Sequence, residues 1–234
     1  MSQGNQRSTR PVVRFQRLAE QVADDLRRRI LNNELPEDSS LPVEELLRAE
    51  YPVSKPTLRE AMRVLEAEGL ITVRRGSIGG AVIHRPTSDN VAYTLGLVLA
   101  SQGVDISDVA AALREAEPAC AAACAERSDR HETVVPRLRE LYERSVEVAD
   151  DFIAVTAASR QFHEAVVQLC GNASLASMAG ALESLWSTHE ADWAKRSTEN
   201  VDIPVAERLE ALKAHLELLE LIEAGDAAGA RAKA

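Results

Sequence analysis

Residues 52–69 have the sequence PVSKPTLREAMRVLEAEG, which predicts a helix that begins near Lys55. Ser54 is a typical N-cap residue because its hydroxyl can accept a backbone N–H of the first turn, and Pro56 fits that turn because its missing N–H needs no partner. Gly69 is expected to end the helix, since glycine readily adopts a positive φ. Apolar side chains at three- and four-residue steps predict one buried stripe, made by Leu58, Ala61, Met62 and Leu65. Four polar side chains fall outside the stripe and are expected to face outward: Lys55, Thr57, Arg59 and Arg63.

The segments on either side complete a small domain around this helix. Residues 15–33 predict a first helix, and a short second helix begins after Leu41-Pro42. Two β-branched segments follow at 70–74 and 81–84, with a glycine-rich connection between them. Three helices and a two-stranded hairpin predict a winged helix-turn-helix, which we assign to residues 12–86 after a flexible arm at residues 1–11.

The resemblance to a known family is carried by residues 41–86, LPVEELLRAEYPVSKPTLREAMRVLEAEGLITVRRGSIGGAVIHRP. This stretch resembles the DNA-binding domain of the GntR family of bacterial transcription regulators, without a gap over residues 41–76. The resemblance implies that the helix from Lys55 enters the major groove and that the hairpin lies along the minor groove. By position, it implies DNA contacts by Ser54, Lys55, Thr57, Arg59, Arg75 and Gly76.

Two features of the sequence qualify this DNA-binding interpretation. Glu45 stands where many members of the family have an arginine, so we expect it either to be solvated or to accept from a cytosine amino group. The net charge of −10 is unevenly spread: residues 1–86 contain 14 Lys and Arg against 12 Asp and Glu, and the other 148 residues contain 13 against 25. Only the N-terminal segment can therefore tolerate a polyanion.

Length and composition indicate a cytoplasmic protein of two modest domains. The 234 residues include no apolar run long enough to span a membrane, and residues 1–10 lack the apolar core of a secretory signal. The three cysteines, Cys120, Cys124 and Cys170, are an odd number without metal-type spacing, so we expect reduced, buried thiols.

The C-terminal part has helical periodicity throughout and makes the fold class mainly α. A polar linker is expected at residues 87–90, followed by a bundle of six or seven antiparallel helices over residues 91–234. The predicted helices cover residues 91–101, 105–127, 132–148, 150–170, 174–196 and 204–224, with a short last one from Asp226.

This second part resembles the all-helical FCD effector domain of the FadR subfamily. The resemblance is carried by LREAEPACAAACA at 113–125, RQFHEAVVQLCGN at 160–172 and HLELLELIEAGD at 215–226. It implies a pocket for a small, often carboxylate-bearing metabolite, in which many members hold a divalent metal through one Asp and three His.

The implied metal ligands are only partly present. His163 and His215 match two of the histidines, Ser159 stands where the carboxylate is expected, and the last histidine would fall beyond Ala234. One alternative is a zinc- or nickel-like ion held by the two histidines with water or ligand oxygens, and the other is a pair of pocket-lining histidines without metal. Arg114 is a candidate clamp for an effector carboxylate, or else an ion-pair partner of Glu117.

Together these features predict a homodimeric transcription regulator, a repressor released from double-stranded operator DNA by a small-molecule effector and without a membrane partner. We expect no enzyme, because the sequence has no nucleophile-and-base spacing or paired-carboxylate motif. Two alternatives stay open: a constitutive DNA-binding dimer with a degenerate sensor, and a metal-dependent enzyme domain fused to a DNA-binding module.

Overall fold

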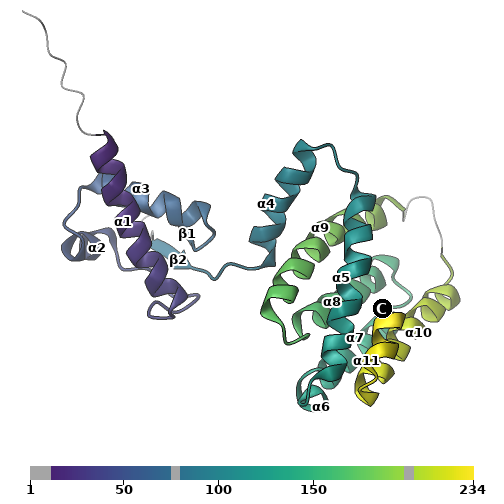
Figure 1. The fold of residues 1–234 in the computed structure, drawn as a ribbon. Coiled ribbons are helices and arrows are strands. Elements are labelled where there is room, and N and C mark those ends of the chain that lie inside the picture. Colours follow the sequence, from purple (N-terminus) through teal and green to yellow (C-terminus); the bar gives the residue numbers. More distant parts are fainter. Residues whose placement is uncertain (1–11, 75–79, 198–202) are drawn as a thin grey trace, which may run out of the picture. The chain divides into compact units, whose positions relative to one another are not determined.

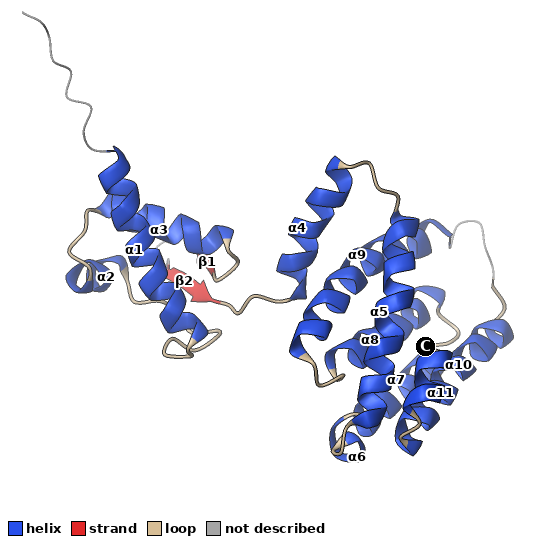
Figure 2. Ribbon diagram, viewed as in Figure 1, coloured by secondary structure: helices blue, strands red, loops and turns tan. Residues whose placement is uncertain are grey.

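The computed structural model describes residues 12–74, 80–197 and 203–234, and the chain divides after Pro86 into two compact units (Figure 1). Within the described ranges the secondary structure is helical apart from one small sheet (Figure 2). The predicted fold class, a winged helix-turn-helix followed by a helical domain, is confirmed. The predicted arm at residues 1–11 lies outside the described residues.

The N-terminal unit contains three helices and a two-stranded wing. The elements are α1 (Val12–Leu31), α2 (Glu44–Glu50), α3 (Lys55–Ala67), β1 (Ile71–Arg74) and β2 (Gly80–Ile83). α3 begins and ends as predicted: the Ser54 hydroxyl accepts the backbone N–H of Thr57, and Gly69 has a φ of 73°. Its apolar stripe is buried at Leu58, Ala61 and Leu65.

The wing is tied to the segment that precedes α2. β1 and β2 pair antiparallel, with Ile71 opposite Ile83. Ser40 forms a bridge with Val82 on the other edge of β2, and the Leu41 N–H donates to the Ala81 carbonyl at 2.8 Å. These bonds fix where the chain enters α2 relative to the wing.

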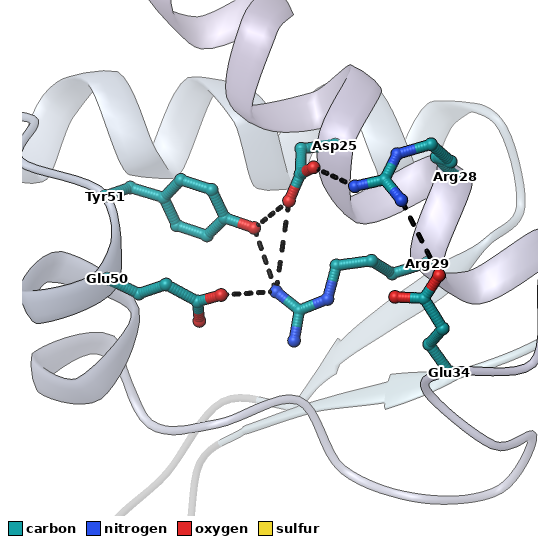
Figure 3. A network of polar contacts seen from close by, with 6 residues as sticks. All are labelled: Asp25, Arg28, Arg29, Glu34, Glu50 and Tyr51. Atoms are coloured by element: carbon teal, nitrogen blue, oxygen red, sulfur yellow. Dashed lines mark hydrogen bonds and ion pairs between the residues drawn. The ribbon is translucent and has the colours of Figure 1, made fainter.

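A polar network holds the turn between α2 and α3 against α1 (Figure 3). Arg29 of α1 donates to Glu50 at 2.7 Å and to the Tyr51 hydroxyl at 2.9 Å, and this hydroxyl donates to Asp25. Partial burial and the hydrogen bond to Asp25 raise the pKa of Tyr51 to about 12, so the hydroxyl keeps its proton at neutral pH. Because Tyr51 lies in the turn before α3, the network sets the direction in which α3 leaves that turn.

The C-terminal unit is an all-helical bundle. Its elements are α4 (Ser88–Ser101), α5 (Ile106–Glu126), α6 (Arg130–Thr133), α7 (Val135–Glu147), α8 (Phe152–Gln168), α9 (Ala173–Ser197), α10 (Val205–Ala224) and α11 (Ala227–Lys233). None of the helices in the described part of the chain is both long and apolar enough to cross a membrane.

Two predicted boundaries in this unit were wrong. The linker expected at residues 87–90 is the first turn of α4, because Thr87 accepts the Asp89 N–H at 3.3 Å while Asn90 accepts the Thr87 N–H at 2.8 Å. The single helix expected over residues 132–148 is divided into α6 and α7, with Pro136 in the first turn of α7. Proline lacks the N–H that a continuous helix would use there.

The core of the bundle is built around α5, α7, α8 and α10. Phe162, Leu138 and Ile222 are fully buried in it, and the three cysteines are free and buried, as expected. The Cys124 thiol donates to the Val166 carbonyl at 3.2 Å and so connects α5 with α8. Burial raises the pKa of this thiol to about 12, which keeps it protonated and unreactive.

Candidate functional site

Three cations line the solvent-exposed face of α3. Lys55, Arg59 and Arg63 follow each other at four-residue steps, and their side chains are 58%, 66% and 75% exposed. They therefore lie on one side of the helix, opposite the buried stripe. The sequence prediction that these three side chains face outward agrees with their exposure.

A groove of about 690 Å³ lies next to this face, between α2, α3 and the wing. Its charged walls are made by Arg59, Arg63 and Glu66 of α3, Arg74 of β1 and Glu44 of α2, and its floor is apolar. A concave surface with three guanidinium groups suits a polyanion, because each can donate two parallel hydrogen bonds to phosphate or to a guanine edge.

Thr57 was predicted to face outward, and this is wrong. Its side chain is buried, and its hydroxyl lies 2.8 Å from the Ser54 hydroxyl. Ser54 is exposed, but its oxygen also accepts the Thr57 N–H at 3.3 Å. Both hydroxyls thus serve the start of α3, and Thr57 is not available to a phosphate.

Glu44 is an acidic residue of this surface that contacts the cations of α3 and was not predicted from the sequence. One carboxylate oxygen lies 3.3 Å from the Lys55 Nζ and the other lies 3.6 Å from the Arg59 Nε. Glu45, which was singled out, is exposed and has no ion pair with any described residue. The predicted wing contacts Arg75 and Gly76 lie outside the described residues.

The helical unit brings a second group of polar side chains together. His163 of α8 and His215 of α10 face each other with 3.0 Å between their Nε2 atoms, and the Ser159 hydroxyl lies 3.5 Å from the His215 Nε2. Glu117 of α5 hydrogen-bonds the His163 Nδ1 on the other side of that ring. The His215 ring also stacks on Phe162, with 4.6 Å between the ring centroids.

These contacts fix the proton on one side of His163. The Glu117 carboxylate accepts the Nδ1–H of His163, and one proton lies between the facing Nε2 atoms of His163 and His215. The His215 Nδ1 is buried and has no hydrogen-bond partner among the described residues. Burial, and next the neighbouring His163, lower the pKa of His215 to about 3, so this ring is neutral at pH 7.

The described residues do not fit a metal ion. Only the Nε2 atoms of His163 and His215 converge, whereas Glu117 is engaged by the far nitrogen of His163 and Ser159 supplies a hydroxyl. In the described ranges, no group of three or more His, Cys, Asp or Glu side chains could hold a metal. Protein sites with imidazole ligands rely on three or four protein donors.

Arg114 is not brought together with the histidines. It is exposed on α5, and neither an ion pair nor a hydrogen bond joins it to Glu117. Glu117 instead is buried and turns toward His163. A signal for Glu117 was present in the sequence, because it continues the buried stripe of α5 from Leu113 to Cys120, and a carboxylate on an apolar stripe needs a partner.

Comparisons with known proteins match each unit separately. Residues 18–79 match the family described as "Bacterial regulatory proteins, gntR family", and residues 108–234 match the FCD domain. The chain is similar over 88 residues to proteins named HTH-type transcriptional repressor NanR, with 35% identity in Edwardsiella tarda and 34% in Klebsiella aerogenes. The match covers 38% of this chain and 33% of each relative, so the chain spans about a third of their length.

One solved structure supports the fold over most of the chain. A GntR protein of Streptococcus agalactiae superposes with a TM-score of 0.68 at 23% identity, covering 92% of this chain and 94% of that one. The FCD match alone covers more than half of the sequence, and the winged unit with its own match precedes it. The chain therefore belongs to the GntR family, as a member that carries an FCD domain.

Proposed function

We propose that the chain is a cytoplasmic, dimeric transcription regulator that binds operator DNA through its winged unit and a small metabolite through its helical unit. The observation that carries the proposal is the exposed row Lys55, Arg59 and Arg63 on α3, next to the groove that Arg74 of the wing also lines. In winged helix-turn-helix proteins this helix lies in the major groove, where arginine and lysine recognise guanine and phosphate.

The charge distribution supports the same division of labour. The first 86 residues are the only segment with an excess of basic residues, and the remaining 148 residues have nearly twice as many acidic as basic ones. The helical unit therefore repels a polyanion, and DNA binding falls to the winged unit. A dimer presents two such units to two half-sites about one helical turn apart.

We place the effector at Ser159, His163 and His215, and propose that no metal is needed there. Two imidazoles that already share one hydrogen bond can offer the same donor and acceptor to a small ligand, and a ligand carboxylate would accept from a ring N–H or the Ser159 hydroxyl. The unpaired His215 Nδ1 supports this placement, because a buried polar atom without a partner is costly and a hydrogen bond to a ligand would remove that cost.

Regulation then follows from linkage between the two binding events. A ligand that prefers a bundle geometry unsuited to the operator spacing lowers DNA affinity, typically by about 1 to 3 kcal/mol. We propose repression released by the ligand, in line with the repressors named among the relatives. A constitutive DNA-binding dimer is the alternative, and it predicts that no small carboxylic acid stabilises the protein in a thermal-shift screen.

The test is selection of bound duplexes from a random-sequence pool, followed by fluorescence anisotropy with the selected duplex. Arg59→Ala should weaken binding at least about fivefold, since a specific arginine contact contributes roughly 1–3 kcal/mol. The thermal midpoint should stay nearly unchanged, because the Arg59 side chain is largely exposed. Arg137→Ala, a matched change at an exposed arginine of the helical unit, is the control. Equal affinities of both variants and the wild type would refute the assigned DNA face.

A further inference from the structure

Glu44 has an unusual position for an acidic residue in a surface that is to bind DNA. It is the first residue of α2, yet its carboxylate reaches across to α3 and lies between the two cations at the start of that helix. Lys55 and Arg59 are one helical turn apart, so a single carboxylate bridges both of them. The three charged groups form a unit, the Glu44 clamp, on the face that borders the groove.

The Glu44 clamp is not explained by stability. Both cations are more than half exposed, and neither contact with Glu44 has the geometry of a hydrogen bond. Ion pairs of this kind in solvent contribute little, because side-chain entropy and screening offset the attraction. A helix-dipole role for an acidic first turn would be met equally well by Glu45, which follows directly. The consequence of the arrangement should therefore appear in binding.

We infer that Glu44 is a specificity-determining residue of the DNA-binding face. Its carboxylate lowers the affinity for nonspecific duplexes more than it lowers the affinity for the operator. This inference rests on the proposed DNA-binding function. A phosphate that pairs with Lys55 or Arg59 must displace the Glu44 carboxylate from that cation and is then repelled by this nearby negative charge. Both effects cost binding free energy. This cost is the same for every sequence, because the phosphate backbone is the same.

A particular base pair can offset the cost. In the major groove a carboxylate accepts a hydrogen bond from the N4 amino group of cytosine, while lysine and arginine bind the O6 and N7 of guanine. The clamp presents both kinds of group within one helical turn, so it matches adjoining C·G and G·C pairs. At the Glu44 position it disfavours guanine and thymine, whose major-groove edges offer no hydrogen-bond donor. Specificity then arises from a penalty on wrong sequences together with a bond to the right one.

The experiment compares full-length wild type, Glu44→Gln and Glu20→Gln. Each protein is used to select duplexes from a random pool, and its affinity is then measured for the wild-type consensus and for a mixed-sequence duplex across a salt series. Glu20→Gln is the matched control, since Glu20 of α1 is exposed and forms no ion pair with a described residue, so the change removes one negative charge from the same unit without touching Lys55 or Arg59.

For Glu44→Gln we expect about fivefold tighter binding to the mixed-sequence duplex at low salt, from loss of one close charge repulsion. The slope of log affinity against log salt should become steeper by about 0.9, equivalent to one more phosphate contact. The preference for cytosine should be lost at one position per half-site, and the ratio of consensus to mixed-sequence affinity should fall. Glu20→Gln should keep the wild-type ratio and consensus.

Two results would overturn the inference, and they differ in what else they overturn. In the first, wild type selects a consensus but Glu44→Gln keeps the same ratio of consensus to mixed-sequence affinity within about twofold. Glu44 is then no specificity determinant, and the proposed function stands. If wild type enriches no sequence, then the inference and the proposed function fail together.

Discussion

Ser54→Ala should destabilise the winged unit, because it affects the hydroxyls of both Ser54 and Thr57. The loss in the free energy of unfolding can be worked out from their hydrogen bonds. The substitution removes the acceptor of the Thr57 N–H, and loss of such an N-cap typically costs about 1 kcal/mol. It also removes the partner of the Thr57 hydroxyl, which is buried, and a buried hydroxyl left without a partner costs at least about 1 kcal/mol. We expect a total loss of about 2 kcal/mol in the free energy of unfolding.

Hydrogen exchange measured by mass spectrometry is the suitable assay. Both tryptophans, Trp186 and Trp193, belong to the helical unit, so their fluorescence would not report on α3. Peptides from residues 55–67 of the full chain should lose protection by about 30-fold, the equivalent of 2 kcal/mol. Peptides from residues 87–234 should exchange as in the wild type.

A double-mutant cycle with Thr57→Val separates the two parts of this effect. Valine has nearly the same shape as threonine but no hydroxyl to satisfy, so Ser54→Ala in that background should cost only the cap, about 1 kcal/mol. The missing remainder is the coupling between the two hydroxyls. A cost below about 0.5 kcal/mol for Ser54→Ala, the lower end for such caps, or a cycle without coupling, would show that the hydroxyl pair does not hold the start of α3.

Two further predictions concern the histidines of the helical unit. Because folding lowers the pKa of His215 from 6.5 to about 3, the unfolded chain binds a proton there below pH 6.5 and the folded chain does not. The free energy of unfolding, measured in urea titrations followed by tryptophan fluorescence, should thus be constant above pH 6.5. Below pH 6.5 it should fall by up to about 1.4 kcal/mol per pH unit. His215→Gln should remove this slope between pH 6.5 and 5, and an unchanged slope would assign it to other groups. The double variant His163→Ala, His215→Ala should abolish thermal stabilisation by any small carboxylic acid that stabilises the wild type in the presence of a chelator, and stoichiometric metal in the purified wild type would contradict the metal-free site.

The features predicted correctly from the sequence depend on neighbours along the chain. The start of α3 needs only Ser54 and Pro56, its end needs Gly69, and its exposed cations follow from a period of 3.6 residues. The burial of Thr57 was not predicted, because this residue lies at the margin of the apolar stripe, next to Leu58. At such a position a small rotation of the helix determines whether the side chain is exposed or buried. Packing, not periodicity, makes that choice.

The contacts that define both candidate sites join residues far apart in sequence. Glu117 and His163 are 46 positions apart, and His163 and His215 are 52 apart, so no local pattern contains the pairs. Glu44 contacts Lys55 across the turn that connects α2 with α3. Its neighbour Glu45 has the same charge and the same helical propensity. Only the direction in which α2 meets α3 distinguishes the two glutamates.

The small number of described cations on α3 and β1 has a consequence for regulation under the proposed function. Lys55, Arg59, Arg63 and Arg74 are the basic side chains on α3 and β1 in the described ranges, and Glu44 partly neutralises two of them. The acidic helical unit adds no attraction for DNA. With few phosphate contacts the affinity for each half-site is modest and falls with salt. An effector coupling of about 1 to 3 kcal/mol, or roughly 5- to 150-fold in affinity, is therefore enough to empty the operator, which a protein with a larger basic surface could not achieve with the same ligand.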